Sequence, residues 1–275
     1  MNPWFETAGS LLLALVGVIL GRWFSRQPRG WWTAGYFIPL LLLLLIALPR
    51  YFSDLEFVPP MSWLISGRTK FALAGFISTL ILTTPLSRLP DRRFRAWIVI
   101  LMTLLVVYSS AWPFLAPAFN RAHLAGLITR IDGNGVCEQS NDYTCGPASA
   151  VTALLRLGLP AEEGTIAIAA HTSSAIGTPP DLLRDALKHL YPTNGLICEY
   201  RHFKSIADLQ NGGFTLAVIK FAPLVDHYVT VLEVTPKEVV AGDPLSGITR
   251  YTHEEFRGLW RFTGVVLQRV GGKPQ

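Results

Sequence analysis

Residues 139–157 read QSNDYTCGPASAVTALLRL, and this stretch decides the fold of the C-terminal half of the chain. Apolar residues recur at helical spacing behind Cys145, and a glycine and a proline then end the run. The pattern predicts a buried helix that begins at or next to Cys145. The partial positive charge and the free N–H groups at such a helix end stabilise a thiolate, which is the nucleophilic form of cysteine.

The segments that follow indicate an α+β domain. A second helix is predicted with Thr178 as its cap, and a short third one over residues 204–209. The period then changes to that of strands, which we expect at 214–221, 227–234, 238–241 and 264–270. Helices first and an antiparallel sheet later are typical of the α+β class. We expect this domain over 136–270, with a linker at 121–135.

Three further residues carry the chemistry that a cysteine nucleophile needs. His227 lies near the start of an apolar strand and can project onto the helix end as a general base. Asp243 lies one strand later, so in a hairpin it can reach the other ring nitrogen and orient the imidazole. Gln139 and the backbone N–H of Cys145 can both donate to the oxyanion of a tetrahedral intermediate. Asp226 is disfavoured as the orienting residue, because neighbouring residues on a strand point to opposite faces.

Each of these residues alone also fits an ordinary structural role. A cysteine at a helix start is usually a small buried apolar residue, and a Gly-Asp-Pro sequence is usually only a turn. A histidine in an apolar strand is more often packed in a core than catalytic. Their joint occurrence, in the order glutamine, cysteine, histidine and aspartate, favours the catalytic interpretation.

The same residues resemble those of the bacteriocin-processing, double-glycine leader peptidases, a branch of the papain-like cysteine peptidases. The resemblance covers roughly residues 136–268 and includes Gln139, Cys145-Gly146-Pro147-Ala148-Ser149, His227-Tyr228-Val229-Thr230-Val231-Leu232, Asp243-Pro244 and a tail from His253 to Trp260. It implies a papain-like fold and hydrolysis of a peptide bond, with leader or precursor peptides as substrates. It also implies the roles of nucleophile, general base, orienting residue and oxyanion-hole donor for Cys145, His227, Asp243 and Gln139 respectively.

The chain departs from that family in two respects. Thr144 precedes the cysteine, where the family commonly has an acidic residue. In the related transporters the peptidase domain comes first and an ATP-driven export module follows. Here it comes last, and the sequence has no G-x-x-x-x-G-K-[ST] phosphate loop. We therefore do not expect this chain alone to couple cleavage to export.

The first half of the chain has the composition of a membrane region. The protein is 50% hydrophobic and only 16% charged, which is too apolar for one ordinary soluble domain. Within residues 1–120, spanning helices are predicted at 7–23, 31–49, 70–87 and 96–114. We interpret the first as a retained anchor and not as a cleaved signal peptide, because Glu6 precedes it and arginines follow it.

The charge distribution predicts an orientation in the membrane. Residues 1–124 hold 11 Lys and Arg against 4 Asp and Glu, whereas residues 125–275 hold 13 against 15. The basic residues lie in loops between apolar segments, which argues against nucleic acid as a partner. Because cytoplasmic loops are enriched in Lys and Arg, the loops after the first and third helices should be inside. The peptidase domain would then lie on the periplasmic or extracellular side of a bacterial inner or plasma membrane.

We expect no metal and no cofactor, because the histidines and cysteines do not occur at the spacings H-E-x-x-H or C-x-x-C. Besides Cys145 there are two cysteines, Cys137 and Cys198. In an oxidising compartment these two could pair as a disulfide, and the alternative of two separate thiols fits the sequence equally well.

Two functions from different classes fit these patterns. The favoured one is a membrane-anchored cysteine peptidase, whose partners are a peptide or protein substrate, membrane lipid and a transporter. The alternative is a binding module that keeps the papain-like fold and holds peptides beside a transport system without turnover. The complete set of four residues favours the enzyme, since binding alone has no chemical need for the cysteine. Acyl transfer to an amine in place of water is a third outcome.

Overall fold

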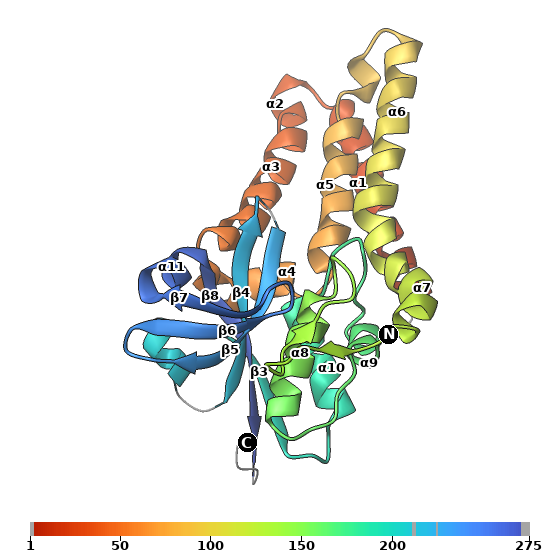
Figure 1. The fold of residues 1–275 in the computed structure, drawn as a ribbon. Coiled ribbons are helices and arrows are strands. Elements are labelled where there is room, and N and C mark those ends of the chain that lie inside the picture. The colour runs from red at the N-terminus through yellow and green to blue at the C-terminus, as the bar shows by residue number, and fades with distance from the viewer. Residues whose placement is uncertain (1–2, 211–212, 224, 271–275) are drawn as a thin grey trace. The chain divides into compact units, whose positions relative to one another are not determined.

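The computed structural model describes residues 3–210, 213–223 and 225–270, and it divides into two compact units, Met1–Ala118 and Phe119–Gln275. The first unit is helical, and Figure 1 labels its elements. They are α1 (Pro3–Ser25), α2 (Arg29–Trp32), α3 (Ala34–Ala47), α4 (Met61–Ile65), α5 (Thr69–Thr83), α6 (Arg92–Val106) and the start of α7 (Trp112–Ala125), with a π-helical turn at Val107–Ala111.

Four helical segments among the described residues are long and apolar enough to cross a membrane. They are Pro3–Ser25, Gly30–Arg50, Thr69–Arg88 and Arg92–Ala125. Large apolar side chains stay exposed on them, including Leu12, Leu44 and Leu104, each more than half exposed. An exposed apolar surface of this extent suits contact with lipid, so these helices are plausible membrane spans by length and by surface.

Helices α1 and α5 pack closely because small residues face each other along them. A Cβ added to Gly17 would lie 2.2 Å from the hydroxyl oxygen of Thr79, and one added to Gly21 would lie 1.8 Å from that of Thr83. Glycine at both positions therefore lets the two backbones approach. Both pairs are separated by 62 residues, so the helices keep one register and run in the same direction.

The same separation recurs at both ends of this helix pair. Glu6 forms an ion pair with the buried Arg68 at one end, and the backbone N–H of Ser87 donates to the hydroxyl of Ser25 at the other, at 3.0 Å. Each helix then enters a Ser-Arg-x-Pro sequence, at 25–28 and at 87–90. The parallel arrangement thus extends over the full length of α1.

Residues 121–135 differ from the linker that we expected. Helix α7 continues to Ala125, and β1 (Arg130–Ile131) pairs with β2 (Cys137–Glu138). The physical reason is burial, because Leu124 is only 1% exposed and its carbonyl oxygen would lie 2.3 Å from a Cβ on Gly164. The segment is therefore packed into the second unit.

The second unit is an α+β domain, as the sequence predicted. Its six-stranded antiparallel sheet has the order β3-β8-β4-β5-β6-β7. The strands are β3 (Leu196–His202), β4 (Phe214–Ala222), β5 (Val225–Val234), β6 (Glu238–Asp243), β7 (Gly247–Thr252) and β8 (Trp260–Arg269). The helices are α8 (Cys145–Arg156), α9 (Glu163–Ala169), α10 (Pro180–Leu190) and α11 (His253–Leu259).

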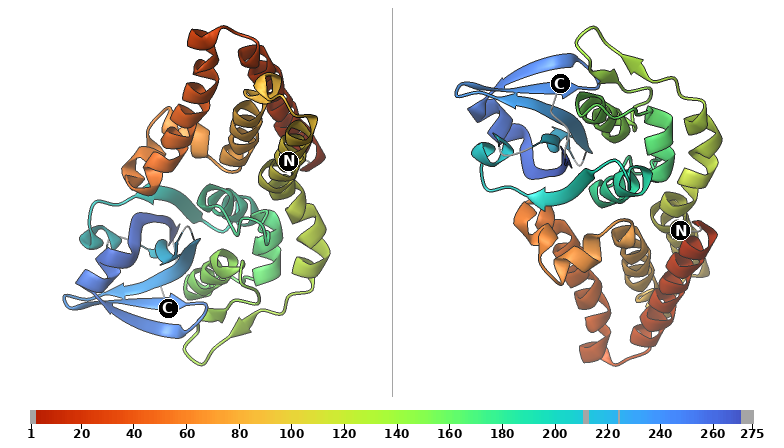
Figure 2. Two further views of the ribbon diagram at one scale, coloured as in Figure 1. Left: turned by 90° about the horizontal axis from the view of Figure 1, so that it is seen from above. Right: turned by 90° about the horizontal axis from the view of Figure 1, so that it is seen from below.

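The sheet separates two hydrophobic cores because side chains alternate along its strands. On β4, Leu216 and Val218 join the core that α8 and α10 cover. Ala217 and Ile219 join the core on the other face, where α11 contributes Phe256. Figure 2 shows the helices on the two sides of the sheet. This packing fixes α8 against the strands that carry the candidate site.

The start of α10 differs in detail from the prediction. Pro179 occupies the N-cap position, and its side chain makes no capping hydrogen bond. The hydroxyl of Thr178 instead lies 2.8 Å from that of Thr172, and its carbonyl accepts a hydrogen bond from Tyr228. The prediction of Thr178 as the cap was therefore wrong, since a side chain near a helix start found a partner in the preceding loop.

Candidate active site

Cys145 is the first residue of α8, the end of the helix at which the backbone N–H groups have no partner within the helix. Two hydrogen bonds fasten this helix to β5, the strand that carries His227. The hydroxyl of Ser149 donates to the carbonyl of Tyr228 at 3.1 Å, and that of Thr230 donates to the carbonyl of Ser149 at 2.8 Å. The helix end and the histidine are thus held by the same pair of elements.

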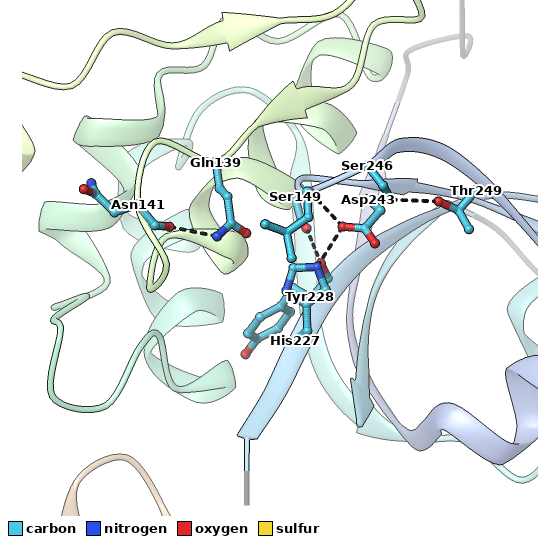
Figure 3. Close-up of polar contacts among 9 residues, drawn as sticks. Gln139, Asn141, Ser149, His227, Tyr228, Asp243, Ser246 and Thr249 are labelled. Carbon is cyan, nitrogen blue, oxygen red and sulfur yellow. Dashed lines mark hydrogen bonds and ion pairs between the residues drawn. The ribbon is translucent and has the colours of Figure 1, made fainter. Parts of the chain in front are cut away.

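His227 connects Asp243 to Cys145. Its Nε2 lies 2.8 Å from Oδ1 of Asp243 (Figure 3), and the nearby Cys145 side chain interacts with the ring and raises the pKa of His227. Because Nε2 is bound to the carboxylate, Nδ1 is the ring nitrogen left for the thiol. The structure thus brings three of the four predicted site residues together, with His227 and Asp243 in direct contact.

The charges of this group support one another. Burial alone would lower the pKa of His227, but hydrogen bonds to Asp243 and Cys145 and the charges of both outweigh it and raise the pKa to about 9. For Asp243, burial would raise the pKa, yet the hydrogen bonds from His227 and from the N–H of Leu245, the latter at 2.8 Å, lower it. The site therefore favours an imidazolium beside a carboxylate.

Gln139 is tied to the turn that follows Asp243. Its backbone N–H donates to the carbonyl of Pro244 at 3.0 Å, and its Nε2 donates to the carbonyl of Asn141 at 2.9 Å (Figure 3). Donation to a carbonyl fixes which end of the amide is nitrogen, and one N–H of Nε2 remains for a ligand. Its Oε1 is buried, without a hydrogen-bond partner among the described residues.

Asp226, the disfavoured orienting residue, has a different partner. Its carboxylate lies 2.9 Å from the guanidinium of Arg261. This agrees with the alternation argument, since the side chains of Asp226 and His227 leave the strand on opposite faces.

One contact of His227 could not be read from the sequence. The ring of Phe221, at the end of β4, lies 5.5 Å from the imidazole ring, although Phe221 itself is 62% exposed. In the sequence Phe221 only marked the end of a strand. In the structure its ring packs beside the imidazole of His227.

The other two cysteines, Cys137 and Cys198, are buried free thiols. Burial raises the pKa of each to about 12. Within the described residues, His, Cys, Asp and Glu side chains form no group of three that could hold a metal ion.

Comparisons with known proteins give this domain relatives. Residues 134–270 match the family described as Peptidase C39 family. An uncharacterized protein of Methanothermobacter marburgensis is 30% identical over 132 residues, which are 48% of this chain and 85% of that protein.

Two solved structures are also similar. The peptidase domain of Streptococcus ComA, described as a bi-functional ABC transporter involved in a quorum sensing pathway, is 19% identical, with a TM-score of 0.42, over 48% of this chain and 96% of that one. A double glycine motif protease from an AMS/PCAT transporter, solved in complex with the leader peptide, is 16% identical, with a TM-score of 0.39, over 52% and 100%. By the family match and the relative from Methanothermobacter marburgensis, the chain belongs to the Peptidase C39 family.

Proposed function

We propose that this protein is a membrane-anchored cysteine peptidase that hydrolyses a peptide bond. Membership of the Peptidase C39 family supports a cysteine peptidase. The observation that carries the proposal is the buried imidazole of His227, whose Nε2 lies 2.8 Å from Asp243 and whose pKa the nearby Cys145 side chain helps to raise. Burying a charged pair costs free energy because the charges lose their water. A binding module has no chemical need for such a pair beside a thiol, whereas a peptidase does.

In the first half of the proposed reaction, His227 holds the proton that Cys145 has given up, and the thiolate attacks the peptide carbonyl carbon. The oxyanion that forms accepts hydrogen bonds from the backbone N–H of Cys145 and from the second N–H of Gln139 Nε2. The imidazolium then donates its proton to the leaving amine as the C–N bond breaks. A thioester on Cys145 remains.

In the second half, a water molecule attacks the thioester and His227 accepts its proton. The C–S bond breaks, the acid product leaves and the proton returns to the sulfur, so the enzyme is restored. Asp243 stabilises the imidazolium in both halves and keeps Nδ1 directed at the sulfur. An amine in place of water would give acyl transfer by the same steps.

The substrate class and setting are proposed by analogy with the family. We propose a leader or precursor peptide as substrate and a separate transporter as partner, with residues 136–270 as the peptidase domain and the helices as its anchor in lipid. The arginine-rich loops favour a peptidase domain outside the cytoplasm. An alkaline phosphatase fused to the C-terminus should then be active, and an inactive fusion beside a bright fluorescent one would overturn this orientation.

Labelling with an electrophilic peptide probe tests the chemistry. We expect the full-length wild type in membranes to be labelled, and Cys145→Ala and His227→Ala to lose labelling. Cys198→Ala is the matched control, since that thiol is buried with a pKa of about 12 and should not contribute. Equal labelling of wild type, Cys145→Ala and His227→Ala would end the enzyme interpretation and leave the peptide-binding module.

A further inference from the structure

A buried carboxylate stands behind the loop that carries Gln139. Glu163, the first residue of α9, is 0% exposed, and it accepts hydrogen bonds from both the backbone N–H and the hydroxyl of Ser140, at 2.9 and 2.5 Å. Its sequence neighbour Glu162 is exposed. A carboxylate is rarely buried unless strong hydrogen bonds offset the loss of its water. The two bonds to Ser140 therefore stabilise Glu163 in its buried position and connect it to the loop.

Glu163 is itself firmly held. Its backbone N–H donates to the hydroxyl of Thr129 at 2.9 Å. The next residue, Gly164, lies so close to the carbonyl of Leu124 that a Cβ would come within 2.3 Å of that oxygen. The start of α9 therefore cannot shift toward or away from the loop without breaking these contacts.

Ser140 lies between the two ends of the hydrogen bond that orients the Gln139 amide. Gln139 Nε2 donates to the carbonyl of Asn141, which also accepts the N–H and the hydroxyl of Thr144, at 3.1 and 3.0 Å. A rotation of Ser140 would move Gln139 and the Asn141 carbonyl relative to each other. The carboxylate that fixes Ser140 thus fixes the direction of the remaining N–H of Gln139.

We propose that Glu163 is a positioning residue that holds Ser140 and thereby aims the Gln139 carboxamide at the oxyanion. It does not touch the reacting atoms and acts only through the loop. The inference rests on the proposed function, because it requires that an oxyanion form at Cys145. It predicts that losing Glu163 impairs acyl transfer while leaving the thiolate itself reactive.

The test compares two reactions of Cys145 in the full-length protein. Iodoacetamide alkylates the sulfur by displacing iodide at a saturated carbon, and no oxyanion forms. N-acetylglycine p-nitrophenyl ester acylates the same sulfur through a tetrahedral oxyanion. We expect Glu163→Ala to slow acylation by up to about 10²- to 10³-fold, the effect of losing one oxyanion donor, and to change alkylation by less than about twofold.

Glu163→Gln should retain most of the acylation rate, because its carboxamide oxygen can accept from the N–H of Ser140 and its NH₂ can donate to the hydroxyl. Glu162→Ala is the matched control and should behave as wild type in both reactions. In a Gln139→Ala background, Glu163→Ala should add no further loss, because both act on the same donor.

Three results would overturn the inference. One is an equal loss of alkylation and acylation in Glu163→Ala, and another is a full additional loss in the Gln139→Ala background. The third is a Glu163→Gln variant that is as slow as Glu163→Ala while melting at the wild-type temperature. A wild type that the ester does not acylate would instead overturn the proposed function, and the inference with it.

Discussion

Replacing Asp243 by asparagine would test how His227 keeps its proton. The substitution preserves the shape of the side chain, and its carbonyl oxygen can still accept the N–H of Leu245, which now lies 2.8 Å from the carboxylate. It removes the negative charge beside Nε2. Any change in His227 can therefore be assigned to that charge and not to a cavity or a rearranged turn.

The magnitude follows from the environment of the ring. The rise of the His227 pKa from 6.5 to about 9 corresponds to about 3 kcal/mol in favour of the imidazolium. Burial acts in the opposite direction, so Asp243 and Cys145 together supply more than this net amount. An adjacent opposite charge commonly changes a pKa by about 1–3. In Asp243→Asn we therefore expect His227 to titrate between about pH 6 and 8.

Side-chain NMR of histidine labelled with ¹³C, in the full-length protein in detergent micelles, would report this pKa directly. The His227 signal is assigned by its absence in His227→Gln. Asp226→Asn is the matched control, because Asp226 pairs with Arg261 and should leave the pKa of His227 at about 9. The reasoning is refuted if Asp243→Asn titrates like wild type, or if Asp226→Asn lowers the pKa as much.

The same change has a consequence for the pH dependence of activity. The imidazolium must donate a proton to the leaving amine, so peptide cleavage by wild type should fall as the pH rises through about 9, where His227 is deprotonated. In Asp243→Asn the lowered pKa moves this decline to lower pH. An alkaline limit at the same pH in both proteins would show that His227 is not the acid.

Three further predictions concern other parts of the chain. Gln139→Ala should lower kcat for peptide cleavage about 10²- to 10³-fold with little change in KM, and an unchanged kcat in steady-state assays would contradict its role. Gly21→Ala should destabilise the helical unit by about 1–3 kcal/mol, because its Cβ would meet a hydroxyl on α5 at 1.8 Å. Gly9→Ala, with open space around it, should not, and equal unfolding temperatures would refute the packing argument. Cys137 and Cys198 should resist iodoacetamide in the native protein and react after unfolding, as mass spectrometry can check.

The central sheet could be predicted because its strands have strong patterns. Residues 214–221, 227–234 and 238–241 are rich in β-formers or alternate apolar and polar side chains, and they form most of β4, β5 and β6. These strands lie inside the sheet, where both faces are buried and few substitutions fit. The helix at Cys145 was equally clear, because its apolar positions, glycine and proline agree.

The outer elements could not be predicted so well. β3 and β7 are the edge strands, and their half-exposed side chains give a weak alternation. α9 has only 7 residues, too few to show a helical period. The role of Glu163 could not be predicted either, because a glutamate at a helix start usually faces solvent. Its partner Ser140 lies 23 residues away, and only the folded chain brings the two together.

The constant separation between α1 and α5 has a consequence for how the chain threads a bilayer. Consecutive crossings alternate in direction, so two neighbours that point the same way need an odd number of crossings between them. In the proposed membrane arrangement, the segment Gly30–Arg50 supplies one. We therefore expect the N-terminus, the stretch ahead of α5 and the residues that leave α7 to emerge from one leaflet. A single side-specific reporter at either terminus would then fix the direction of every crossing.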